Sequence, residues 1–266
     1  MERCLQNLSE RRFMKTYLKY ICSIAPLLVC SATFATEEAV FNIEAEAMET
    51  LELTPNIDNG RKIFKTCALC HSPEGWGTKD GHTPEIAGQH SSVIIKQLTD
   101  IRQGNRDNPT MLPFTNPDVI DKQDIADVAA YVEKLKMSPE NLTGPGDDLE
   151  LGAEIYAKEC ADCHGKNGEG DAKEFYPSIH GQNYNYLLRQ LLWIKEGKRR
   201  NANRNMVKQL QRFSEKELRA VIDYSSRLTP DSSKLAEPGW KNPDFPKDFV
   251  FSPRYKEEPK KKQENK

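Results

Sequence analysis

The sequence predicts an all-α protein built from two tandem copies of one small helical domain. Residues 57–137 and 147–229 match one another at an offset of 93 positions, so that Gly88 meets Gly181. A repeat of this regularity indicates a duplicated domain. Apolar residues recur at helical spacing in both copies, and no segment alternates convincingly as a strand would. We call the two ranges domain 1 and domain 2.

Three helices are expected in each domain. The first leads toward a cysteine-containing motif. The second runs over about His90–Gln103 in domain 1 and Asn183–Glu196 in domain 2, and each stops at a glycine suited to a left-handed cap. The last opens with a capping residue, Asp121 or Ser214, and Ser214 with Glu217 makes a capping box.

The motif is the pentapeptide Cys-x-x-Cys-His. It occurs twice, as Cys67, Cys70 and His71 and again as Cys160, Cys163 and His164. Thiols at i and i+3 share one side of a helical turn, and the histidine that follows can become an axial ligand of a haem iron. A single Cys-x-x-Cys could be a thiol redox pair or half a zinc site. Two copies, each followed by histidine and each inside the repeat, predict two covalently bound haems c, which would also act as the staple that so small a domain needs.

The N-terminus resembles an export signal. Residues 1–35 combine early basic residues, an apolar stretch over 20–29 and small residues before Thr36. The uncharged stretch is shorter than a membrane span requires. An uncleaved anchor is the alternative, and a lipid-anchored Cys30 is weaker still. The three remaining cysteines all lie within this segment, so cleavage leaves no spare thiol for a disulfide or for haem ligation.

Methionines are the candidates for the sixth haem ligand. Four lie beyond residue 35: Met48, Met111, Met137 and Met206. Met111 and Met206 are expected in polar, irregular loops at equivalent places of the two domains. A lone methionine usually fills a gap in a core. The recurrence instead favours Met111 and Met206 as axial ligands beside His71 and His164.

Other histidines are weaker candidates for iron ligands, and two prolines are candidates to support the haem histidines. His82, His90 and His180 do not recur between the copies, so we expect surface or supporting roles for them. Pro84 and Pro177 each follow the haem histidine by 13 residues. We expect a carbonyl there to accept the Nδ1–H of His71 or His164 and fix its tautomer, with a simple turn as the alternative for each proline.

Charge is unevenly distributed. The chain has a formal net charge of −2, yet residues 36–145 carry 10 basic and 18 acidic groups while 146–266 carry 23 and 20. Such a dipole can orient a diffusing protein. A basic cluster precedes Met206 and comprises Lys198, Arg199, Arg200 and Arg204. We expect it to dock a redox partner, with a solvated loop as the alternative; nucleic-acid binding is not indicated.

The repeated string Pro-x-x-x-Gly-Gln, Gln-Leu and Gly-x-Arg, followed by a loop methionine, resembles the di-haem cytochrome c4 family. The resemblance covers residues 55–136 and 147–229. It implies two tandem class I cytochrome c domains, each a small helical bundle around a covalent haem c and related by pseudo-twofold symmetry. It also implies Met111 and Met206 as ligands, and electron shuttling in the periplasm of a Gram-negative type of cell.

Implied partners are a membrane cytochrome complex or quinol oxidase as donor and a terminal oxidase or reductase as acceptor. A monomer or weak dimer with loose membrane-surface association is expected. The acidic segment 36–56, the linker 138–146 and the tail 230–266 have no counterpart in the repeat. We expect the aromatic half of the tail to cross a domain and its lysine-rich end to be disordered.

Two function classes remain open. The chain is either an electron carrier with two six-coordinate haems, or a small-molecule oxidoreductase or haem subunit of one. The second class would act on a sulfur compound or peroxide and need one labile haem.

Overall fold

A computed structural model describes residues 45–250. The predicted signal peptide, residues 36–44 of the acidic extension and the lysine-rich end lie outside the described residues. The chain divides into two units at Glu46 and Ala47, and both predicted domains belong to the second unit. No helix within residues 45–250 is both long and apolar enough to cross a membrane.

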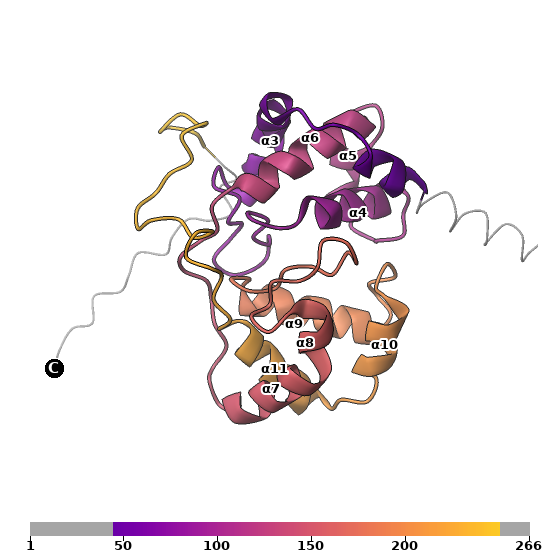
Figure 1. Ribbon diagram of the computed structural model, residues 1–266, viewed down its shortest axis with the longest axis vertical. Helices are drawn as coiled ribbons and strands as arrows, with labels where there is room; N and C mark the ends of the chain where they lie inside the picture. Colours follow the sequence, from indigo (N-terminus) through magenta and orange to yellow (C-terminus); the bar gives the residue numbers. More distant parts are fainter. Residues whose placement is uncertain (1–44, 251–266) are drawn as a thin grey trace, which may run out of the picture. The chain divides into compact units, whose positions relative to one another are not determined.

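Domain 1 contains four helices, with α3 and α6 crossing in its core (Figure 1). They are α3 (Ile57–His71), α4 (Ser91–Arg102), α5 (Leu112–Thr115) and α6 (Lys122–Lys134). The Asn56 side chain accepts the backbone N–H groups of Asp58 and Asn59 at the start of α3. Asp121 caps α6 in a reciprocal capping box with Asp124. These caps satisfy N–H groups that have no partner inside a helix.

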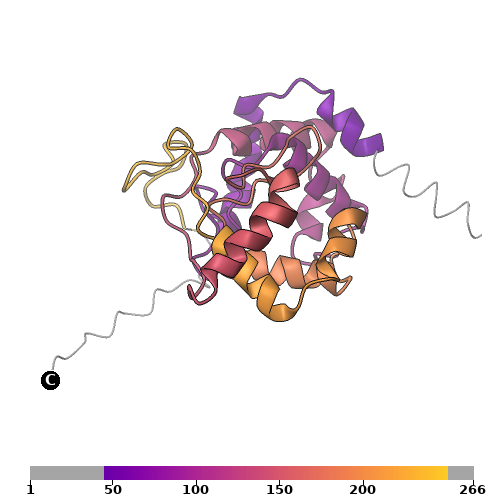
Figure 2. The same cartoon turned by 60° about the horizontal axis from the view of Figure 1, so that its bottom comes forward.

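Domain 2 repeats the arrangement with α7 and α11 as the crossing pair (Figure 2). Its elements are α7 (Leu149–Ile155), the π-helix η1 (Tyr156–Cys160), α8 (Ala161–His164), α9 (Tyr184–Lys195), α10 (Arg204–Leu210) and α11 (Glu215–Ser225). The capping box predicted between Ser214 and Glu217 is present at the start of α11. Within the described residues the only β-type pairings are isolated bridges, as an all-α fold requires.

A glycine allows close contact at each crossing. A Cβ atom on Gly60 would lie 2.1 Å from the carbonyl oxygen of Asp127, and one on Gly152 would lie 2.2 Å from that of Ala220. No side chain fits at either place. The helix backbones therefore touch directly, and an aromatic pair packs beside each contact: Phe64 with Tyr131, and Tyr156 with Tyr224.

The π-helix resolves a mismatch in the repeat. Gly60 and Phe64 match Gly152 and Tyr156 at an offset of 92, whereas the haem-binding cysteines match at 93. Domain 2 therefore has one more residue between Tyr156 and Cys160 than domain 1 has between Phe64 and Cys67. The wider turn of η1 absorbs that residue, so the crossing and the haem motif both keep their places. The constant offset of 93 predicted from the sequence therefore fails in this helix, and it fails again at Met111 and Met206, which lie 95 positions apart.

The tail crosses domain 1, as expected for its aromatic half. We call residues 230–250 the strap. Phe245 packs edge-on against Phe64 with ring centroids 6.0 Å apart, and Trp240 lies beside Trp76. The Tyr131 hydroxyl donates to Asp244 at 2.8 Å. The strap thus extends the core of domain 1 with residues that follow domain 2 in the chain.

Candidate functional site

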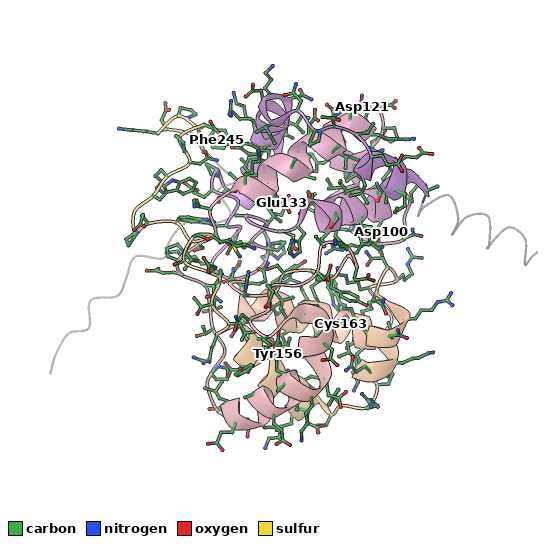
Figure 3. All side chains as sticks on the ribbon, in the orientation of Figure 1. Asp100, Asp121, Glu133, Tyr156, Cys163 and Phe245 are labelled. Atoms are coloured by element: carbon green, nitrogen blue, oxygen red, sulfur yellow. The ribbon has the colours of Figure 1, made fainter. Side chains whose placement is uncertain are left out.

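The two pentapeptides end the first helical segment of each domain. Cys67 is partly buried and Cys70 is exposed near the end of α3, and Cys160 and Cys163 repeat this difference. Figure 3 labels Cys163, which lies in the short helix α8. No disulfide joins any of these four cysteines. Cys67 packs against the main core cluster of domain 1, and Cys160 packs against that of domain 2. Each motif therefore faces an apolar interior.

Burial opposes a thiol redox role. It raises the pKa of Cys67 to about 11 and that of Cys160 to about 12. A redox-active Cys-x-x-Cys pair instead needs a thiol with a lowered pKa. The two sites therefore lack the low thiol pKa that makes the cysteines of dithiol oxidoreductases reactive.

The haem histidines are held by the predicted prolines. The Nδ1 atom of His71 lies 3.0 Å from the carbonyl oxygen of Pro84, and that of His164 lies 3.1 Å from that of Pro177. Burial lowers the pKa of both imidazoles. A neutral ring that donates through Nδ1 presents the Nε2 lone pair, which is the form that a metal binds.

The two methionines occupy different local structures. Met111 is half-buried at the N-cap of α5, which agrees with a loop position. Met206 lies inside α10, so its placement in an irregular loop was wrong. The Asn203 side chain accepts the Asn205 N–H and so starts this helix early. Met206 packs against the same core cluster as Cys160.

Two of the three histidines outside the motifs have backbone partners. His90 Nε2 lies 2.7 Å from the carbonyl oxygen of Glu169, in the other domain. His180 is buried, with Nδ1 3.0 Å from the carbonyl oxygen of Asn167, so of the two expected roles its position suits the supporting one. His82 is exposed.

The predicted basic cluster does not act as one surface. Lys198 is exposed and pairs with Glu196, and Arg200 donates to the carbonyl oxygen of Gly104 in domain 1. Arg204 is exposed at the start of α10. Arg199 instead turns inward, and burial followed by the nearby charge of Arg106 lowers its pKa to about 10. Arg199 is therefore half-buried, whereas Lys198, Arg200 and Arg204 are exposed.

Arg199 belongs to a polar cluster between the domains that sequence reasoning missed. Arg199 donates to the side-chain oxygens of Gln190 and Gln97 at 3.0 and 3.1 Å. Arg106, its equivalent in domain 1, donates to Gln97 at 2.8 Å and to Gln190 at 3.4 Å. All four residues belong to the repeated string. Their shared offset of 93 was the signal that they could meet around a local twofold axis.

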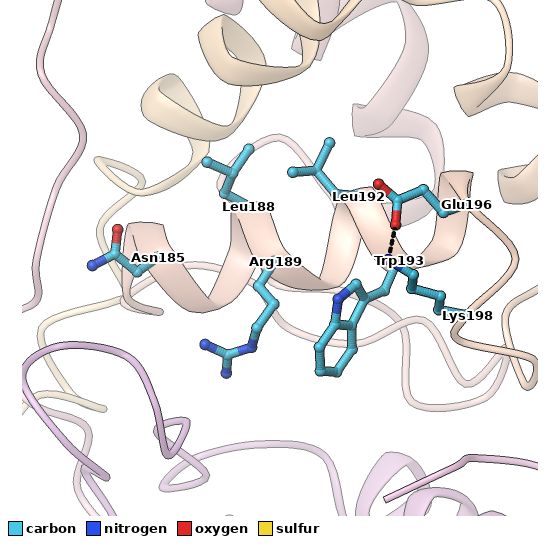
Figure 4. A pocket seen from close by; sticks show the side chains of 7 residues that line it. All are labelled: Asn185, Leu188, Arg189, Leu192, Trp193, Glu196 and Lys198. Carbon is cyan, nitrogen blue, oxygen red and sulfur yellow. Dashed lines mark ion pairs between the residues drawn. The ribbon is translucent and has the colours of Figure 1, made fainter.

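A shallow pocket of about 310 Å³ opens along α9 (Figure 4). It is lined by Asn185, Leu188, Arg189, Leu192, Trp193, Glu196 and Lys198. Asn185 donates to Asp80 and Arg189 to Gly81 and His82, all in domain 1. The pocket is therefore the open edge of the interface between the domains.

Comparison with known proteins agrees with this geometry. The family model "Cytochrome c" matches residues 57–136 and again 149–228. Cytochrome c4 of Azotobacter vinelandii is 31% identical over 184 residues, which cover 64% of this chain and 87% of that protein. The chain belongs to the cytochrome c4 family. It therefore carries two covalent haem c groups and acts as an electron carrier.

Two further similarities extend this result. The crystal structure of reduced cytochrome c4 from Pseudomonas stutzeri superposes with a TM-score of 0.58 at 25% identity, covering 66% of this chain and all of that one. A protein described as a thiosulfate dehydrogenase electron acceptor, from Stutzerimonas stutzeri, is 30% identical and covers 67% of this chain and 90% of its own length.

The residues present fit the haem of a cytochrome c4. The thiols would supply covalent attachment, the neutral histidines a ligand for the iron, and the apolar clusters a water-poor setting. Haem also carries propionate carboxylates, and buried arginines are normally paired with acids. Arg106 and Arg199 hydrogen-bond mainly neutral oxygens, from Gln97, Gln190 and Tyr186. Burial would raise the pKa of Tyr186, yet the two guanidinium charges lower it. This cationic cluster is suited to hold propionates.

Proposed function

We propose that this electron carrier is periplasmic and keeps both haem irons six-coordinate, with His71 and Met111 in domain 1 and His164 and Met206 in domain 2. The observation that carries the proposal is the duplicated histidine support, in which Pro84 and Pro177 fix both rings in one tautomer. A strong-field pair of histidine and methionine favours electron transfer over substrate binding.

Three substitutions test the ligands. M111L and M206L should each remove half of the visible absorption that marks methionine bound to ferric haem, and each should open one haem per chain to carbon monoxide. M137L is the matched control. Met137 is buried, with only 4% of it exposed, lies beside Gly88 and Gly181, and is not a proposed ligand. If M206L left the spectrum unchanged, another residue would be the domain 2 ligand.

The partners are proposed from chemistry. A membrane cytochrome complex would supply single electrons and a terminal oxidase would accept them. Lys198, Arg200 and Arg204 would dock an acidic patch on one of these partners. Reversing the charge of these three should slow electron transfer most at low salt, where screening is weakest. R219E, on α11, is the control, and equal effects of both changes would refute this docking surface.

A sulfur-compound dehydrogenase is a second candidate donor. The similarity to a thiosulfate dehydrogenase electron acceptor supports it. The oxidised protein should not be reduced by thiosulfate alone, but should be reduced rapidly when a thiosulfate dehydrogenase is added. Reduction by thiosulfate alone would instead make this chain the enzyme.

A further inference from the structure

One peptide group links each haem histidine to the opposite domain. In domain 1 this is the peptide between Pro84 and Glu85. Its carbonyl oxygen lies 3.0 Å from Nδ1 of His71, and its N–H donates to Oε1 of Gln182 at 3.2 Å. The Gln182 amide also donates to the carbonyl oxygen of Glu85 at 2.8 Å. A glutamine from domain 2, only 8% exposed, thus holds the peptide that holds His71.

The reverse arrangement occurs in domain 2. The carbonyl oxygen of Pro177 lies 3.1 Å from Nδ1 of His164, and the N–H of Ser178 donates to Oε1 of Gln89 at 3.0 Å. Gln89 donates in turn to the carbonyl oxygen of Ser178 at 2.9 Å. The two bridges are equivalent under the repeat. Each is a chain of three groups: an imidazole, a peptide and a glutamine amide from the other domain.

Hydrogen bonds in such a chain strengthen one another. A peptide whose N–H is bonded is more polarised, so its carbonyl oxygen becomes a better acceptor. A stronger bond at Nδ1 makes the imidazole a more basic ligand. A more basic ligand stabilises the oxidised iron and lowers the reduction potential.

We infer that Gln182 and Gln89 are positioning residues that tune the reduction potential of the haem in the opposite domain, each through the peptide that supports that haem's histidine. This inference rests on the proposed ligation by His71 and His164. The reduction potentials of both haems would therefore depend on how closely the two domains are packed. Opening the interface would raise both potentials together.

The test is a crossed pattern of potentials. Q182M keeps the side-chain length but removes both hydrogen-bonding groups. At a fixed potential it should shift the oxidised-to-reduced ratio of haem 1 about threefold toward the reduced form, or about 28 mV at 59 mV per tenfold, and leave haem 2 almost unchanged. Q89M should do the same to haem 2. Spectroelectrochemistry gives the potentials, and NMR of the haem methyl groups assigns each to its domain.

Two further variants separate tuning from loosening of the interface. N185A removes the Asn185 side-chain bond to the Asp80 carbonyl oxygen, another bond between the domains, and should shift neither haem. Q182E keeps an oxygen that can accept the Glu85 N–H. In this variant the reduction potential of haem 1 should be equal to or lower than in the unmodified protein. If Q182M does not fold, Q89M and Q182E decide the question.

Several results would overturn the inference. Q182M could shift haem 2 as much as haem 1, N185A could match Q182M, or the glutamine variants could leave both potentials unchanged. Failure of the proposed pairing of histidine with methionine would be seen in the unmodified protein, whose ferric spectrum would lack the methionine band. The two failures are therefore distinguishable.

Discussion

In domain 1 the haem motif ends an uninterrupted helix of 15 residues, whereas in domain 2 it follows a π-helix of five residues. Domain 1 also receives the strap, whose Phe245 and Asp244 contact Phe64 and Tyr131. Tyr224, the equivalent of Tyr131, instead packs against Tyr156 of its own domain. The same motif can therefore be held on unequal supports, provided that the crossing glycine and the histidine's proline keep their places.

The largest expected effect is the loss of a haem. Cys67→Ser with Cys70→Ser, or Cys160→Ser with Cys163→Ser, should leave the affected domain poorly folded, because so small a core needs its staple. Domain 1 should retain more helix than domain 2, because the strap still covers it. Circular dichroism with limited proteolysis measures this, and native helix content in either variant would contradict it.

The strap should stabilise domain 1 selectively. F245A removes a ring that is only 9% exposed in the domain 1 core, and should cost about 3 kcal/mol of unfolding free energy. V250A, at a side chain 78% exposed, is the control and should change little. Denaturant unfolding followed at each haem would show the effect in domain 1. Equal destabilisation of both domains would mean that the strap acts on the interface instead.

A buried carboxyl group should make the stability of domain 1, but not that of domain 2, depend on pH. Burial raises the pKa of Glu85 well above its ordinary value, whereas domain 2 has Ser178 at this position. The folded protein therefore loses stability as pH rises from the ordinary glutamate pKa through the raised one. E85Q should match the parent protein in mild acid and exceed it at higher pH, while keeping an oxygen for the Ser138 N–H. Parallel stability curves for the two proteins would show that Glu85 does not titrate in this way.

The π-helix should be the least sensitive feature. Deleting Lys158, an exposed residue of η1, would give domain 2 the spacing of domain 1. We expect two haems per chain to remain and stability to change by no more than about 1 kcal/mol, since surface changes usually have small effects. Haem content by absorbance checks this. Loss of the second haem would show that the π-turn itself positions Cys160.

Much of this structure was predictable, and for identifiable reasons. Helix ends marked by caps, such as Asp121 and Ser214, depend on local sequence and were placed correctly. The proline contacts to His71 and His164 also follow from a fixed local spacing.

The remainder depends on contacts distant in sequence. Arg199 seemed to belong to an exposed basic run, but its partner Gln97 lies in the other domain. The helix around Met206 and the π-helix before Cys160 arise where packing competes with weak local preferences. Aligning the two domains at a single offset of 93 also hid the extra residue between Tyr156 and Cys160.

The central claim is that both haems are closed to exogenous ligands and serve electron transfer only. The most direct test is a carbon monoxide difference spectrum of the dithionite-reduced mature protein. The account predicts no spectral change, because Met111 and Met206 would hold the sixth positions. A carbon monoxide complex at one haem per chain would contradict it and would favour an enzyme with one labile haem.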